Sequence, residues 1–127
     1  MKSLTQRTVD HYTNLGFISC SAESYNAFSG RKHDLFGFID LVVLARKQGI
    51  IGVQVSSISN HLARKKKILS SANAIWWIQS GARIVIMTWE GDTRKEEEIT
   101  LPMFVEFARK KSKPIVEKVS SSTDSLL

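Results

Sequence analysis

The amino-acid sequence predicts a single α/β domain in which a mixed central sheet is flanked by helices. Two short, strongly apolar runs, 35–44 and 50–55, have the length and hydrophobicity of strands that are buried on both faces. A helical pattern over residues 59–79 separates the second run from a third apolar run at 83–89, which allows a crossover between two strands of one sheet. With 127 residues, the chain has the size of one ordinary domain.

The first part of the chain predicts a helix, a strand and a loop. Apolar residues recur at helical spacing over residues 3–15, and Gly16 ends this helix. Residues 17–23 alternate between apolar and polar, as in a half-buried strand, whereas residues 24–34 have the composition of a polar loop. Residues 47–49 are expected to turn the chain between the two apolar runs, which would then pair as a hairpin.

The remaining elements complete the order helix, strand, strand, strand, helix, strand. The long helical pattern is expected to break at residues 70–71, and residues 94–100 are expected to form a short edge strand. A final helix is predicted over residues 101–111. The domain should therefore extend over residues 1–119, while residues 120–127 lack an apolar pattern and are expected to be a disordered tail.

The composition points to an intracellular protein with an acidic partner. Eighteen Lys and Arg against twelve Asp and Glu give a formal charge of +6. Nucleic acid is the first polyanion to consider, because clustered cations that bind its phosphates gain affinity through counterion release. A basic protein without a polyanionic partner is the alternative. The single cysteine, Cys20, excludes an intramolecular disulfide and favours a reducing compartment. With no signal-peptide pattern and no membrane-spanning apolar stretch, a soluble cytoplasmic protein that does not associate with membranes is expected.

Polar residues interrupt the two apolar runs at positions that can converge. Asp40 lies where a carboxylate is costly unless it is hydrogen-bonded, paired or bound to a metal. Gln54 and Ser56 share one face of the second strand. In a hairpin, Asp40 and Gln54 lie near the open end, and oxygen ligands from adjacent strands suit a hard cation such as Mg²⁺ or Mn²⁺. An aspartate that only caps a turn or meets an arginine is the alternative.

The stretch from Ile39 to Ser56 resembles the core of the PD-(D/E)XK nuclease superfamily, in which an aspartate begins one strand and an acid, any residue and a lysine follow on the next. Together with a helix that ends at Gly16-Phe17, it is similar in particular to archaeal Holliday-junction resolvases and related phage nucleases, over residues 4–90. The resemblance implies a restriction-endonuclease-like fold. It also implies a Mg²⁺-dependent endodeoxyribonuclease that acts on branched or duplex DNA, with a structure-selective junction resolvase as the most specific form.

The resemblance also implies roles for individual residues. Asp40 corresponds to the metal-binding aspartate, Gln54 takes the place of the second acid, and Val55 would offer its backbone carbonyl to the metal. Ser56 stands where the lysine is expected, and it cannot supply the cation that stabilises developing charge. Lys32, Lys65 and Lys66 are candidates to fill that gap, with Lys65 taken as the catalytic residue. The acid that such nucleases carry on the first helix would correspond to Gln6 or Asp10.

Basic residues in two segments are candidates for DNA contact. The run 64–67 would grip phosphates, although four consecutive helical residues fan around most of a helix, so at most two or three can face one ligand. A solvated helix face is the alternative. Another pair, His33-Asp34, would assist proton transfer or bind a metal's water, unless it is a solvated loop. The predicted DNA-binding residues are Arg31, Lys32, His33, Arg64, Lys65, Lys66 and Lys67.

Two further functions and an assembly state follow from other features. A catalytically inactive DNA-binding module on the same fold is the first alternative to a nuclease. The second is a basic scaffold that binds protein through Trp76-Trp77, of which one should face the core and the other would pack at an interface or stack on a base. A homodimer is expected because cutting two strands requires two sites. Apolar residues that follow Leu101 would form its interface: Phe104, Phe107, Ile115 and Val116.

Overall fold

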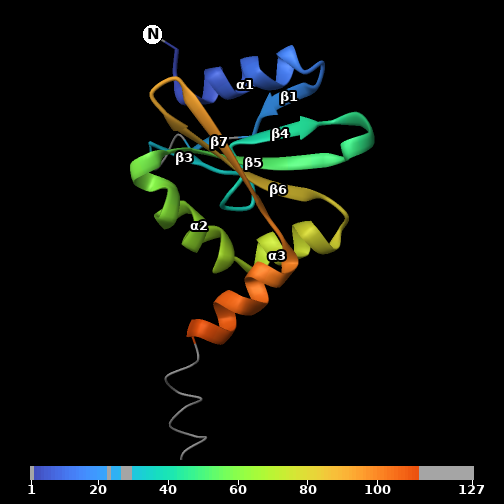
Figure 1. The fold of residues 1–127 in the computed structure, drawn as a ribbon, viewed down its shortest axis with the longest axis vertical. Coiled ribbons are helices and arrows are strands. Elements are labelled where there is room, and N and C mark those ends of the chain that lie inside the picture. The colour runs from blue at the N-terminus through green and yellow to red at the C-terminus, as the bar shows by residue number, and fades with distance from the viewer. Residues whose placement is uncertain (1, 23, 27–29, 112–127) are drawn as a thin grey trace, which may run out of the picture.

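The computed structural model describes residues 2–22, 24–26 and 30–111, and it is an α/β fold. A five-stranded mixed sheet has the order β1-β4-β5-β6-β7, and a separate two-stranded sheet is formed by β2 and β3. Figure 1 shows helix α1 on one face of the large sheet and α2, α3 and the helix of residues 101–111 on the other. Among the described residues, none of the helices is long and apolar enough to cross a membrane.

Helix α1 (Leu4–Asn14) and strand β1 (Ile18–Ser21) lie where the sequence predicts them. The helix begins after Ser3, whose hydroxyl accepts a hydrogen bond from the backbone N–H of Gln6 at 3.1 Å. Gly16 ends it at a φ of +82°, a conformation that glycine adopts without the steric cost that a side chain would impose. Strand β1 then pairs antiparallel with β4 at one edge of the sheet.

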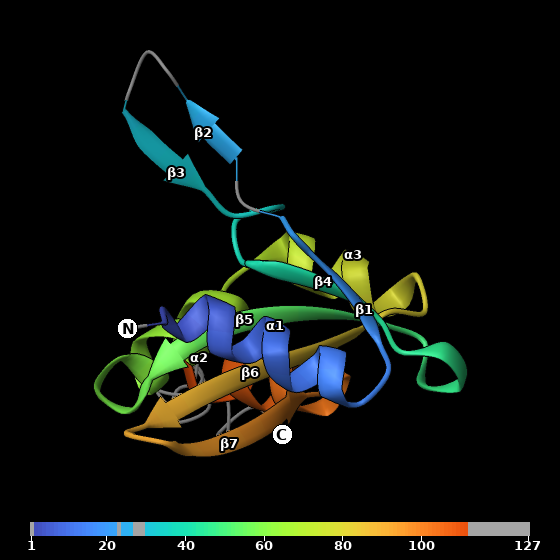
Figure 2. The ribbon, with the colours of Figure 1, turned by 90° about the horizontal axis from the view of Figure 1, so that it is seen from above.

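The prediction of a plain loop over residues 24–34 was wrong. Strands β2 (Ser24–Asn26) and β3 (Arg31–His33) pair antiparallel, and Figure 2 shows this hairpin projecting away from the large sheet. Neither three-residue strand shows a run of alternating apolar residues, which is why the hydrophobic pattern did not indicate them.

The first apolar run is also not one continuous strand. Only Leu41–Leu44 forms β4, whereas residues 35–40 fold into a turn that is closed by a β-bridge between Leu35 and Ile39. The turn depends on positive φ values of 54° at Phe36 and 86° at Gly37. The turn still contributes apolar side chains to the core, since Ile39 is fully buried there.

The hairpin, the crossover and the helix break are confirmed. Strand β5 (Ile50–Ser57) pairs antiparallel with β4 across the short helix η1 (Arg46–Gln48), and parallel with β6 (Arg83–Glu90). The connection from β5 to β6 runs through η2 (Ile58–Asn60) and two helices. These are α2 (His61–Leu69) and α3 (Ala72–Gln79), which are separated at the predicted serine pair.

The sheet ends in strand β7 (Thr93–Ile99), antiparallel to β6, and residues 101–111 form the predicted last helix. Phe104 on this helix is buried in the core, so it is not available for the dimer interface predicted from the sequence. Ile115 and Val116, like the predicted tail at 120–127, lie outside the described residues.

Two hydrophobic clusters hold the layers together. One lies between α1 and the sheet and includes Tyr12 and Val53, and the other lies under α2, α3 and the last helix and includes Ile68 and Ile86. Because the sheet is covered on both faces, the polar residues of β5 lie in the interior, and a functional site must open where the cover ends.

Candidate functional site

A polar hollow of about 290 Å³ opens at the carboxyl end of β5. In open α/β sheets, ligands usually bind at the carboxyl ends of parallel strands. The first turn of α1, the turn of residues 34–40, the end of β5, helix η2 and helix α2 all contribute to it. We call it the Asp40 hollow, and it is lined by Leu4, Thr5, Asp34, Asp40, Val55, Ser56, Ser57, Asn60 and Arg64.

Asp40 lies immediately before β4, and its buried carboxylate is hydrogen-bonded. Its Oδ2 accepts from Nε2 of Gln54 at 2.7 Å and from the backbone N–H of Val55 at 2.8 Å. The strand register explains the contact, because Leu41 lies opposite Val53 and the preceding residue therefore lies beside Gln54. The structure thus brings together the two residues that the sequence singled out, and it supplies donors that offset the cost of burying a carboxylate.

Gln54 presents its nitrogen, rather than its oxygen, to Asp40. The side chain is fully buried, and its Oε1 has no hydrogen-bond partner among the described residues. In this orientation Gln54 serves as a hydrogen-bond donor to the carboxylate, and the role of oxygen ligand to a metal would require its amide to turn over. The unpaired oxygen is a cost of about 1–3 kcal/mol that a cation or a donor at this position would remove.

The position predicted to correspond to the lysine of the PD-(D/E)XK pattern holds a hydroxyl. Ser56 is buried, and its Oγ donates to the backbone oxygen of Ser57 at 2.7 Å. Its neighbour Val55 lines the same hollow, and Thr5 contributes a further hydroxyl from α1. The end of β5 and the first turn of α1 therefore contribute neutral groups to the hollow, and its positive charge comes from another element.

The basic run of α2 is divided among three environments. Arg64 lines the Asp40 hollow. Lys65 points instead to β7, where its Nζ donates to Glu97 at 2.7 Å, and it is not among the residues that line the hollow. Lys67 forms an ion pair with Asp34 at 3.1 Å. The run therefore does not act as one surface, and Lys65 does not line the hollow, as the catalytic role predicted for it would require.

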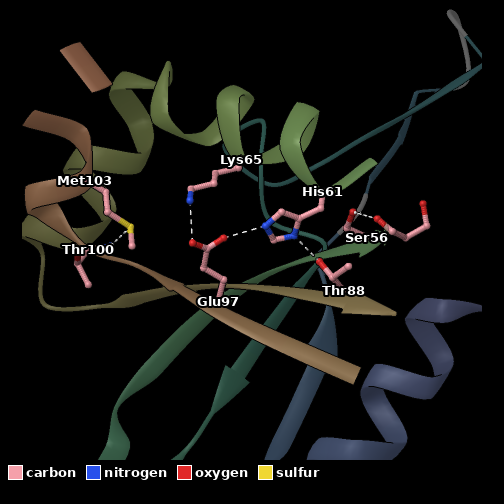
Figure 3. A network of polar contacts seen from close by, with 8 residues as sticks. Ser56, His61, Lys65, Thr88, Glu97, Thr100 and Met103 are labelled. Carbon is pink, nitrogen blue, oxygen red and sulfur yellow. Dashed lines mark hydrogen bonds and ion pairs between the residues drawn. The ribbon is translucent and has the colours of Figure 1, made fainter. Parts of the chain in front are cut away.

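A polar network, shown in Figure 3, connects α2 to β6 and β7. Nε2 of His61 lies 2.8 Å from Glu97 and its Nδ1 lies 2.7 Å from the hydroxyl of Thr88. Because a carboxylate only accepts, Nε2–H donates to Glu97, and Nδ1 shares the second hydrogen bond with the hydroxyl of Thr88. Burial raises the pKa of Glu97, but the hydrogen bonds from Lys65 and His61 outweigh it and lower that pKa. These contacts fix the rotation of α2 and so determine which of its side chains faces the hollow.

The acid predicted on the first helix is not in the hollow. Gln6 and Asp10 lie one turn apart on α1 and bond to each other at 3.0 Å. Lys2 pairs with Asp10 at 2.7 Å, and the hydrogen bonds from Lys2 and Gln6 lower the pKa of that carboxyl. The residue of α1 that lines the hollow together with Leu4 is Thr5, which sequence reasoning did not select.

Of the other predicted contact residues, His33 and Lys66 do not line the hollow. Arg31, Lys32 and His33 form β3 of the projecting hairpin (Figure 2). Lys66 is exposed on α2. Of the tryptophan pair, Trp77 packs edge-on against the buried Phe38. The prediction that one of the pair faces the core is therefore confirmed, while Trp76 is 71% exposed.

Asn60 and Arg64 are the lining residues whose place the sequence indicated least. Asn60 precedes α2 and would ordinarily be read as its cap, yet its side chain makes no capping hydrogen bond. Arg64 was one of four equivalent cations in the sequence, and only the rotation of α2 distinguishes it from its neighbours. The two are one helical turn apart and therefore lie on the same side of the helix.

Comparison with known proteins adds no relative on which a function could be based. Neither a protein-family model nor a curated protein matches this sequence. The geometry of the Asp40 hollow is therefore the basis for a functional assignment.

Proposed function

We propose that this protein is a metal-dependent endodeoxyribonuclease with a restriction-endonuclease-like core and that the Asp40 hollow is its active site. The observation that carries the proposal is that Asp40, Val55 and Ser56 meet in one polar hollow at the carboxyl end of β5. Asp40 and Ser56 stand at the aspartate and lysine positions of the PD-(D/E)XK pattern, whereas Gln54, at the position of the second acid, bonds to Asp40 without lining the hollow. The order of elements also supports the proposal. A helix precedes an antiparallel hairpin, and a helical crossover then leads to a parallel strand of the same mixed sheet, as the proposed core requires.

The residues of the hollow fit a hard divalent cation. Mg²⁺ usually binds one or two carboxylates and completes its shell with waters and phosphate oxygens. Two carboxylates line the hollow, Asp40 and the Lys67-paired Asp34, together with the hydroxyl-bearing residues Thr5, Ser56 and Ser57. No group of three or more acidic, histidine or cysteine side chains is arranged for a metal within the described residues, so DNA phosphates would have to complete the site. A bound Mg²⁺ would activate a water molecule and neutralise phosphate charge.

A cleavage assay tests the proposal directly. Supercoiled plasmid and a four-way DNA junction are incubated with the protein in Mg²⁺, in Mn²⁺ and in EDTA. We expect nicked plasmid and resolved junction with either metal and no product in EDTA. If DNA binds at low salt but remains intact in both metals, the nuclease assignment is wrong.

That outcome would support the second candidate, a DNA-binding module that does not cleave. Its specific support is the geometry of Gln54, whose amide nitrogen donates a hydrogen bond to Oδ2 of Asp40. In the nuclease pattern, an acid at this position would bind the metal together with the aspartate. Ser56 supplies no positive charge. Both features are compatible with binding to phosphate, whereas both weaken a metal-dependent step.

We also propose that the protein acts as a homodimer, since two strands of a duplex or junction must be cut and one chain offers one site. Sedimentation at micromolar concentration should give about twice the chain mass. A monomer that still nicks plasmid would leave the nuclease assignment intact and remove the junction-resolving form of it.

A further inference from the structure

The Asp40 hollow poses an electrostatic problem for any nucleic-acid substrate. Two carboxylates line it, of which Lys67 balances Asp34 but not Asp40, and a phosphodiester would add a further negative charge. Ser56, which lines the hollow from β5, is neutral. Among the lining residues, Arg64 is the one Lys or Arg side chain.

The state of Arg64 differs from that of two lysines that follow it on the same helix. Lys65 and Lys67 are neutralised by Glu97 and Asp34, respectively. Arg64 makes no hydrogen bond or ion pair with any described residue, and its Nε is buried without an acceptor. A buried N–H without an acceptor is destabilising, and natural proteins rarely keep one unless a water, an ion or a ligand satisfies it.

The surroundings of Arg64 supply further donors on the same wall. Asn60 lies one turn earlier on the same side of α2, and its amide is not used as a helix cap. This wall also holds the amino-terminal, partially positive end of α2. The turn of residues 34–40 contributes Asp34 and Asp40 to the hollow, and Asp34 is paired with Lys67 of α2. The hollow therefore holds both a buried carboxylate, Asp40, that suits a cation and a guanidinium, Arg64, that suits an anion.

We propose that Arg64 and Asn60 form a binding site for a phosphate group of the nucleic acid, with Arg64 supplying the positive charge that Ser56 lacks. A guanidinium can donate two parallel hydrogen bonds to two phosphate oxygens, which an ammonium cannot do. The His61–Glu97–Lys65 network holds α2 so that Arg64 faces the hollow. This inference rests on the proposed function only for the identity of the substrate, because a phosphate site can exist without cleavage.

The test compares Arg64→Met with Lys47→Met, a matched loss of one exposed positive charge at the other end of β5, in η1. Binding of a short DNA duplex in Ca²⁺ is measured at several salt concentrations. Arg64→Met should weaken binding by about tenfold or more and lower the salt slope by about one, whereas Lys47→Met should change neither. Arg64→Lys should recover the salt slope but not the rate of cleavage, which should remain roughly a hundredfold lower.

A second readout is independent of cleavage. In NMR titrations of the wild-type protein with inorganic phosphate, the Nε–H signal of Arg64 should shift and saturate, and Asn60→Ala should weaken that response. A perturbed Arg64 signal in a protein that does not cut DNA would support the phosphate site while the nuclease assignment fails. An unperturbed signal, or an Arg64→Met variant that binds duplex as well as Lys47→Met, would overturn the phosphate site even if cleavage is observed.

Discussion

The substitution Gln54→Glu is expected to destabilise the metal-free protein at neutral pH by about 3–5 kcal/mol and to make its stability depend on a divalent cation. The Gln54 side chain is fully buried, and its nitrogen lies 2.7 Å from Oδ2 of Asp40. A glutamate would place a second carboxylate at this distance in the interior. Two like charges so close cannot both remain ionised without a cation between them.

The pH dependence of Gln54→Glu follows from the same contact. Asp40 and the introduced glutamate would together hold one proton with a folded-state pKa above the unfolded value of about 4.3. The penalty is therefore absent below about pH 4, where both states are protonated, and it grows as the pH rises from there to the folded-state pKa. Thermal unfolding at acidic and neutral pH, with and without MgCl₂, measures both effects. Gln54→Met, which removes the donor without adding charge, separates the charge effect from the lost hydrogen bond.

The second large effect is expected for Asp40→Asn, which should abolish cleavage and Mg²⁺ binding and also lower the free energy of unfolding. The carboxylate accepts hydrogen bonds from Gln54 and from the backbone of Val55. An asparagine has one acceptor oxygen and would face one of these donors with its own NH₂ group, at a cost of about 1–3 kcal/mol. Without these donors, removal of a buried charge would instead have been neutral or stabilising.

Cleavage assays, Mn²⁺ titration and thermal unfolding measure the three consequences for Asp40→Asn. Asp92→Asn is the control, because Asp92 is a fully exposed carboxylate. Full cleavage by the Asp40→Asn variant would exclude Asp40 as a metal ligand. A raised transition temperature would show that the two hydrogen bonds do not compensate the buried charge.

The sequence was sufficient for the elements that bury apolar residues with a regular period. Such patterns predict the hairpin of β4 and β5, the crossover, and the separation of α2 from α3. Asp40 meets Gln54 because the register of the two paired strands places these residues beside each other. The turn over residues 35–40 could not be anticipated, because an apolar run gives no sign that Phe36 adopts a positive φ.

The choice of Arg64 over Lys65 also depends on information that is not local. Both residues belong to one basic run, and helical geometry alone permits either to face a site. Their environments are decided by His61 and Glu97, which are 36 positions apart in the sequence and meet only after β7 has joined the sheet. A short motif therefore indicated Asp40, whereas the position of Arg64 in the hollow depends on tertiary contacts.

The two edges of the large sheet differ in their capacity to accept another strand. Along β7, Thr93–Ile99 carries two positive and three negative side chains, a composition that discourages edge-to-edge pairing. Along β1, Ile18–Ser21 has no charged residue and no proline. Antiparallel pairing of two copies through β1 would use up the one receptive edge of each, so that sheet extension of this kind ends with two molecules and cannot continue into a filament.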